Sequence, residues 1–143
     1  MKLAIVYHSA GGNTKALAEI IHSYLPGAEI YRIADFSLEK IDEYDGLLIG
    51  TYTWGSGDIP AKMLSFYREL EERDISHLTT GVFGTGETNY KHFCNAVNHF
   101  RNMLYINSNL AVVLKVEQMY QTTDLKRIKK FVELFQNKVR NSI

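Results

Sequence analysis

The chain has 143 residues, of which 45% are hydrophobic and 22% are charged. This length is typical of one globular domain, so we expect a single domain over residues 1–143 with a core large enough to fold without disulfides. The single cysteine excludes an internal disulfide and a multi-cysteine zinc site, and it favours a reducing, cytoplasmic location. The longest uninterrupted apolar stretch, residues 110–114, is far shorter than the roughly 20 residues that span a bilayer. We therefore expect no membrane segment.

Positive and negative charges balance. The 16 Lys plus Arg and 16 Asp plus Glu give a formal net charge of zero, which excludes a generally basic nucleic-acid-binding protein. The charges are unevenly placed, because residues 1–90 contain 13 acidic and 7 basic side chains whereas residues 91–143 contain 3 and 9. Two interpretations stay open: an electrostatic dipole, or a basic excess that is the solvated face of a C-terminal helix.

Apolar patterning predicts strands that alternate with helices. Continuous or alternating apolar runs indicate strands at residues 2–7, 28–33, 45–51, 80–84 and 110–116. Helical spacing indicates a helix that starts at Asn13 and ends before Pro26-Gly27, and others over 61–73, around 93–104 and over 123–139. Short connections imply parallel strands joined by right-handed crossovers, with helices on both faces of one sheet. A sheet of order 2-1-3-4-5 and a truncated dinucleotide-binding variant both fit this length.

The first of three polar loops indicates a phosphate site. In an open α/β sheet the ligand lies beyond the carboxyl ends of the strands, here at residues 8–14, 51–60 and 84–91. The first loop brings the hydroxyls of Ser9 and Thr14, the Asn13 amide and two glycines to the start of a helix, which favours an anion held by backbone N–H groups. A plain N-cap is the alternative. Because the G-x-x-x-x-G-K-[ST] and G-x-G-x-x-G patterns are absent, a phosphomonoester is favoured.

The other two loops carry one prominent aromatic residue each. Trp54, the only tryptophan, lies beside a glycine, and Tyr90 follows Gly84-Thr85-Gly86. Two surface aromatics near a phosphate site favour stacking on a flat heterocycle, although packing of Trp54 against the domain is the alternative. Together the loops predict a mononucleotide-like ligand with a large ring.

These residues resemble the flavodoxin family. Its phosphate-loop pattern, [ST]-x-x-[AGC]-x-T-x-x-x-A-x-x-[LIV], is matched by Ser9, Gly12, Thr14, Ala18 and Ile21. The segments TYTWGSGD at 51–58 and GTGETNYKHFC at 84–94 are similar to the family's other two flavin loops. The resemblance implies a flavodoxin-like three-layer α/β sandwich with a five-stranded parallel sheet of order 2-1-3-4-5. It also implies the short-chain type, since no long insertion interrupts the last strand.

The resemblance implies non-covalent binding of FMN. It places the phosphate on residues 9–14, the isoalloxazine ring between Trp54 and Tyr90, the phosphate and ribityl side near Thr51 and Thr53, and the pyrimidine end at residues 84–87. The implied cofactor-binding residues are Ser9, Ala10, Gly11, Gly12, Asn13, Thr14, Thr51, Tyr52, Thr53, Trp54, Gly55, Ser56, Gly84, Thr85, Gly86, Glu87, Asn89, Tyr90, Phe93 and Cys94. The Gly55-Ser56 peptide matches one that flips on reduction, after which the Gly55 carbonyl accepts a hydrogen bond from N5 and stabilises the neutral semiquinone.

The implied function is a low-potential, one-electron carrier without substrate turnover of its own. It would act as a cytoplasmic monomer between a flavodoxin reductase and electron-accepting enzymes, with no nucleic-acid or membrane partner and no metal. Negative charge near N1 of the ring, close to Asp58 and Glu87, would keep the second potential low. The neutral net charge departs from the acidic character of the family, so docking on a basic reductase would depend on a local acidic patch. Its candidates are Glu43, Asp58, Glu69, Glu71, Glu72 and Glu87.

Two other functions within the superfamily remain alternatives: a flavoprotein activator of manganese ribonucleotide reductase, and an FMN-dependent quinone reductase. A phosphoacceptor receiver domain is excluded, because His8-Ser9 and Thr51 stand where that class needs acidic residues. We expect Cys94 to be a buried apolar side chain rather than a redox thiol. His8 and His92 flank the flavin loops and are candidates for coupling protonation to the redox potential.

Overall fold

One parallel sheet organises the molecule. The computed structural model of the chain describes residues 1–53, 57–87 and 93–143. Its five-stranded sheet has the order β2-β1-β3-β4-β5, and every neighbouring pair is parallel. The strands are β1 (Leu3–Tyr7), β2 (Glu29–Arg32), β3 (Gly46–Tyr52), β4 (Thr79–Gly86) and β5 (Asn109–Glu117). The expected fold class and strand order are therefore confirmed.

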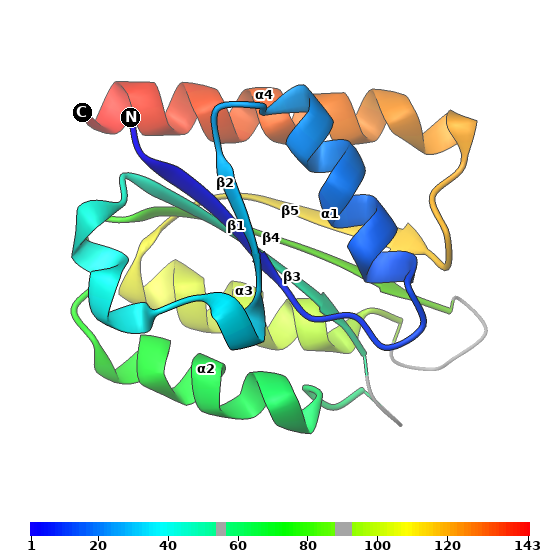
Figure 1. Cartoon of the computed structure of the whole chain (residues 1–143), viewed down its shortest axis with the longest axis horizontal. Coiled ribbons are helices and arrows are strands. Elements are labelled where there is room, and N and C mark those ends of the chain that lie inside the picture. The colour runs from blue at the N-terminus through cyan, green and yellow to red at the C-terminus, as the bar shows by residue number, and fades with distance from the viewer. Residues whose placement is uncertain (54–56, 88–92) are drawn as a thin grey trace.

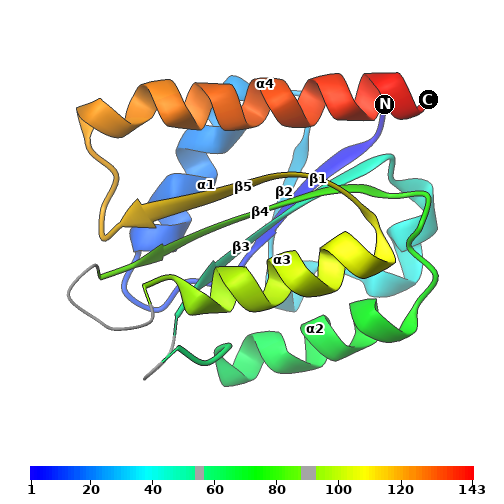
Figure 2. The same cartoon turned by 180° about the vertical axis from the view of Figure 1, so that it is seen from behind.

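Helices cover both faces of the sheet. Helices α1 (Asn13–Tyr24) and α4 (Leu125–Ser142) lie on one face, and α2 (Ala61–Glu72) and α3 (Asn95–Asn107) lie on the other (Figure 1). The view from behind shows the same three layers, with α4 above the sheet and α2 and α3 below it (Figure 2). The layers enclose two apolar cores, one on each side of the strands. Burial of apolar area in these cores is the main stabilising contribution to the fold.

The central strands are buried on both faces because their side chains alternate between the two cores. In β1, Leu3, Ile5 and Tyr7 pack on the side of α1 and α4, whereas Ala4 and Val6 pack on the side of α2 and α3. This is why β1 and β3 appear in the sequence as nearly continuous apolar runs rather than as alternating ones.

The connection from β2 to β3 contains no α-helix. It forms two short 3-10 helices, η1 (Ile33–Asp35) and η2 (Leu38–Glu43), in a segment for which the sequence predicted no element. Leu38, Ile41 and Tyr44 are buried at intervals of three residues, which is the period of a 3-10 helix. These three side chains thus belong to the apolar core on the side of α2 and α3.

Element ends differ from the prediction by a few residues. Helix α3 ends at Asn107 and α4 spans Leu125–Ser142, while β4 is longer than expected at both ends. In α4, Ile128, Val132, Phe135 and Val139 are buried, and Lys126, Arg127, Lys129 and Lys130 are exposed. The basic excess near the C-terminus therefore includes a solvated helix face. Within the described residues, no helix combines the length and apolarity that crossing a bilayer requires.

Candidate cofactor site

The three polar loops meet at one edge of the sheet. Parallel register pairs Tyr7 of β1 with Gly50 of β3, and Thr51 and Tyr52 of β3 with Gly84 and Thr85 of β4. The segments that follow these strands therefore leave the sheet at the same end, opposite to both chain termini (Figure 1). The His8 N–H donates to the Gly50 carbonyl across 3.1 Å, which fixes the start of the first loop against β3.

The first loop presents free backbone donors at the start of α1. The Ser9 Oγ accepts a hydrogen bond from the Gly12 N–H (3.1 Å), and the first bond of the helix runs from the Ala16 N–H to the Gly12 carbonyl (2.9 Å). Gly12 has φ 96°, a conformation that favours glycine. Within the described part of the chain, the N–H groups of Ala10, Gly11, Asn13 and Thr14 have no acceptor. Such donors, together with the positive end of the helix dipole, suit a phosphate.

A buried pair of hydroxyls links this loop to β4. The Oγ1 atoms of Thr14 and Thr85 are 2.8 Å apart, and both side chains are buried. One hydroxyl donates and the other accepts, so the accepting group keeps its own proton for a third partner. The pair brings two of the expected cofactor-binding residues together from positions 71 apart in the sequence.

The second loop is tied to the first turn of α3. The Ala96 N–H donates to Thr53 Oγ1 (3.2 Å), and Asn95 Nδ2 donates to the Gly57 carbonyl (3.3 Å). Thr51 is buried and its hydroxyl donates to the Tyr52 carbonyl (2.8 Å). The hydroxyls of Thr51 and Thr53 thus hold the loop itself, and their proposed contact with the phosphate and ribityl side stays a prediction.

The third loop begins where backbone, α3 and β3 approach closely. A Cβ at Gly84 would lie 2.3 Å from Val97 Cγ2 and 2.5 Å from the Thr51 carbonyl oxygen, so only glycine fits. Cys94 has φ 51° and is 1% exposed, and burial raises the pKa of its thiol to about 11. A neutral, buried thiol agrees with the apolar role expected for it.

His8, Tyr52 and Lys62 form a group that the sequence did not reveal as such. The His8 and Tyr52 rings have centroids 5.4 Å apart. The pKa of His8 is lowered, first by burial and then by the positive charge of Lys62 on α2. Lys62 also lines a separate surface pocket of about 350 Å³, whose other described lining residues come from α2 and from residues 33–38.

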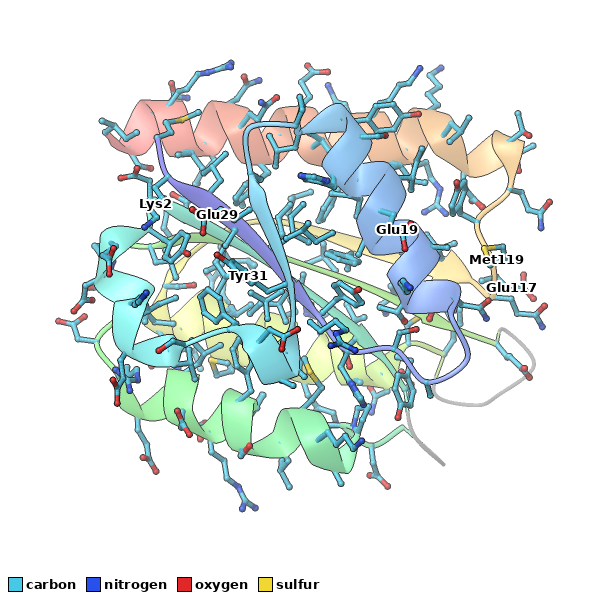
Figure 3. The ribbon with its side chains drawn as sticks, viewed as in Figure 1. Lys2, Glu19, Glu29, Tyr31, Glu117 and Met119 are labelled. Atoms are coloured by element: carbon cyan, nitrogen blue, oxygen red, sulfur yellow. The ribbon has the colours of Figure 1, made fainter. Side chains whose placement is uncertain are left out.

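A fourth segment reaches the same end of the molecule. Gln118, with φ 50°, donates its N–H to the Gly86 carbonyl (2.8 Å). Glu117 and Met119 lie on either side of it, at the same end as the first turn of α1 (Figure 3). The sequence predicted three loops at this edge, but the segment after β5 also reaches it because all five strands are parallel.

Several expected cofactor-binding residues lie outside the described part of the chain: Trp54, Gly55, Ser56, Asn89 and Tyr90. The same holds for His92. Of the others, Ala10 and Gly11 are exposed, Glu87 is half-buried, and Phe93 is half-buried against the core beneath α2 and α3. The stacking of two aromatics on a ring therefore stays a prediction.

Comparison with known proteins agrees with this geometry. The family model described as flavodoxin matches residues 5–106. The chain is 40% identical over 103 residues to "Probable flavodoxin 2" of Bacillus subtilis, covering 68% of each chain. It is 33% identical over 110 residues to the flavodoxin of Maridesulfovibrio salexigens, covering 72% of this chain and 75% of that one.

Solved structures extend the similarity over nearly the whole chain. Oxidised flavodoxin 2 of Bacillus cereus superposes with a TM-score of 0.89 at 31% identity, covering 96% of this chain and 99% of that one. A flavodoxin of Streptococcus pneumoniae superposes with a TM-score of 0.90 at 27% identity and the same coverage. A Fusobacterium nucleatum flavodoxin mutant, solved bound to flavin mononucleotide, shares the fold at 14% identity with a TM-score of 0.71, covering 99% of this chain and 96% of that one.

The chain belongs to the flavodoxin family, whose members are electron-transfer flavoproteins that bind FMN and work with redox partners. The described residues fit this cofactor. FMN ends in a phosphomonoester, and the loop at residues 9–14 offers the free N–H donors that such a group requires.

Proposed function

We propose that this chain is a low-potential electron carrier that binds FMN non-covalently and passes single electrons, through the neutral semiquinone, from a reductase to acceptor enzymes. It acts as a cytoplasmic monomer of one domain and turns over no substrate of its own. The observation that carries the proposal is the set of free N–H donors at the start of α1, next to the ends of β3 and β4. FMN supplies the redox chemistry when bound, and the loops hold and tune it.

In this proposal each loop has a separate task, and contacts among the described residues support that division. The free N–H groups of Ala10, Gly11, Asn13 and Thr14 hold the phosphate with neutral donors. The Thr14–Thr85 pair fixes the loop against β4. The bonds from Asn95 and Ala96 hold the second loop at the start of α3. A cofactor held at several fixed points changes its position little between redox states, which suits rapid electron transfer.

Only some of the acidic candidates for partner docking lie at the end of the molecule that holds the three loops. Asp58 is exposed just before α2, and Glu87 follows β4. Glu69, Glu71 and Glu72 lie toward the far end of α2, and Glu43 pairs with Lys2 (3.1 Å) at the amino end of the sheet. Of the six candidates, we therefore propose Asp58 and Glu87 as the residues that steer a basic reductase.

The proposal is tested by an electron relay. NADPH, a flavodoxin reductase and oxidised cytochrome c are combined with and without the FMN-loaded protein. We expect cytochrome reduction to depend on the protein, to disappear when FMN is removed, and to fall for Trp54→Ala through weaker FMN binding. NADPH-dependent turnover of a quinone without a reductase would instead identify a quinone reductase, and no relay with any reductase would contradict the carrier function.

A further inference from the structure

His8 occupies the single position between β1 and the phosphate loop. Its N–H donates a hydrogen bond to the Gly50 carbonyl, which holds the backbone of the residue in place. Its half-buried ring packs beside the Tyr52 ring at the end of β3. The next residue, Ser9, accepts the hydrogen bond that shapes the loop. An imidazole is therefore held two positions before Ala10, the first of the free N–H donors of the loop.

The charged surroundings of His8 are simple. Lys62, on the first turn of α2, is the charged group that acts on it among the described residues. On the other side of the strand, Glu19 of α1, Arg32 and Asp35 act on the neighbouring Tyr7. Arg32 and Asp35 neutralise each other in an ion pair at 3.3 Å. In the free protein, burial and Lys62 keep the pKa of His8 below its ordinary value, so the ring is neutral at pH 7.

We propose that His8 is a proton-accepting part of the phosphate site: when FMN binds, its phosphate draws a proton from solvent onto the His8 ring, and Lys62 adds a second positive charge. The inference rests on FMN binding and not on electron transfer to partners. A protonated His8 supplies the positive charge that the loop lacks. The N–H donors of the loop are neutral, so they leave the two negative charges of the phosphate uncompensated.

The sign of the effect follows from linkage. A phosphate that raises the pKa of His8 binds more tightly to the protonated protein. The affinity for FMN therefore increases as the pH falls from the His8 pKa of the FMN complex to that of the free protein. Each unit of difference between these two pKa values gives about a tenfold gain. Riboflavin has no phosphate and should show no such gain.

The most direct test is an NMR titration of the wild-type imidazole signals, which needs no folded variant. The protein is titrated from pH 5 to pH 9 ligand-free, loaded with riboflavin and loaded with FMN, and the His8 signal is assigned by its loss in His8→Gln. We expect the His8 pKa to rise by about one unit or more with FMN alone. Equal values in the riboflavin and FMN complexes would overturn the proposal.

Affinity measurements give an independent test. Dissociation constants for FMN and riboflavin are measured by flavin fluorescence from pH 6 to pH 8.5 for the wild type and His8→Gln. The matched control is His77→Gln, because His77 lies at the opposite end of the sheet, exposed and 3.9 Å from Asp42. The phosphate of FMN itself titrates near pH 6, but this contribution is common to all three proteins.

For FMN, we expect wild type and His8→Gln to agree within about twofold at pH 8.5 and to differ by about five- to tenfold at pH 6. His77→Gln should follow the wild type throughout, and riboflavin affinity should show no pH-dependent difference, which also reports that the variant is folded. Lys62→Gln should weaken FMN binding a few fold, less so at high salt. A ratio between wild type and His8→Gln that stays constant with pH would overturn the proposal and leave the carrier function untouched.

Discussion

Thr14 lies in the loop that we propose to hold the phosphate. Its hydroxyl is buried against that of Thr85, with the two oxygens 2.8 Å apart. The sequence predicted the residue but not its partner, because nothing in a linear pattern pairs hydroxyls 71 positions apart. The pair explains how a polar side chain is tolerated at a buried position, since a buried hydroxyl without a partner is costly.

We predict that Thr14→Val weakens FMN binding by about tenfold and riboflavin binding much less, because one hydroxyl proton near the phosphate is lost. Dissociation constants for both flavins test this. Thr80→Val is the matched control, since it breaks a similar hydroxyl pair, Thr80–Ser108 at 2.7 Å, near the other end of β4. An equal loss for FMN and riboflavin in Thr14→Val would remove the phosphate role.

Glu29 is the centre of a second polar group, far from the loops. Its Oε1 accepts hydrogen bonds from the Tyr44 hydroxyl (2.5 Å) and the Tyr31 hydroxyl (2.8 Å), and Lys2 lies 4.7 Å from the centre of the Tyr44 ring. Figure 3 shows Lys2, Glu29 and Tyr31 close together on the side of β2. The bond from Tyr44, then that from Tyr31, lowers the pKa of Glu29 below 4.5.

A lowered carboxyl pKa stabilises the fold above the unfolded-state value, and this stabilisation is lost as the pH falls through the folded-state value. We predict that Glu29→Gln lowers the free energy of unfolding by about 1 kcal/mol at pH 7. The difference from wild type should narrow as the pH falls below 4.5. Urea unfolding of the FMN-free protein at pH 7, 5 and 3.5 measures it, with the exposed Glu39→Gln as control. A difference that does not change with pH would argue against the charged hydrogen bonds.

At the scale of elements, periodicity predicted most of the fold. The strands β1 and β3 are apolar on both faces, so their positions were clear. Prediction failed where burial and polarity disagree: β4 extends beyond the predicted 80–84 to include Thr79 and Thr85, which are polar but buried. It failed again at the end of α3, where the apolar face stops at Leu104 while the helix continues through the exposed Tyr105 and Ile106. At this end the side chains of Asn107 and Ser108 donate hydrogen bonds to the Met103 and Leu104 carbonyls.

The contact between β4, β3 and α3 gives a prediction at this scale. We predict that Gly84→Ala destabilises the FMN-free protein by about 1–3 kcal/mol, since the added methyl meets the Thr51 carbonyl, which cannot rotate away as a side chain can. Urea unfolding measures the loss. At Gly27 a Cβ meets no atom within 4 Å, so Gly27→Ala should change stability by no more than about 1 kcal/mol. Equal effects of the two substitutions would contradict the close approach.

Over the whole molecule the net charge is zero, but acidic side chains are in excess in residues 1–90 and basic ones in residues 91–143. Helix α4, which carries exposed basic side chains, lies on one face of the sheet. Asp58 and Glu87 follow β3 and β4 in the chain, so they lie at the end that holds the loops. Local rather than net charge should therefore govern the approach of a partner.

We predict that the double variant Asp58→Asn, Glu87→Gln is reduced by a basic reductase several fold more slowly at low ionic strength, with a weaker dependence on salt. Stopped-flow reduction at two salt concentrations measures this. Glu71→Gln with Glu72→Gln, at the far end of α2, should behave like the wild type. If both double variants slow equally, general charge and not a local patch controls docking.

In the candidate site, too, the sequence predicts local features but not contacts between distant elements. The sequence predicts a phosphate site at residues 9–14 because glycines and hydroxyls stand together at the start of a helix. The sequence did not predict that Lys62 acts on His8 or that Gln118 bonds to Gly86. Both interactions depend on how helices and strand ends pack in space.

The measurement that tests the central claim most directly is a visible absorption spectrum during stepwise anaerobic reduction, with the released cofactor identified by mass. We predict that FMN is released in stoichiometric amount, and that a long-wavelength band of the neutral semiquinone rises and then falls as electrons are added. Bleaching in a single two-electron step, or a colourless protein that takes up no FMN, would contradict it.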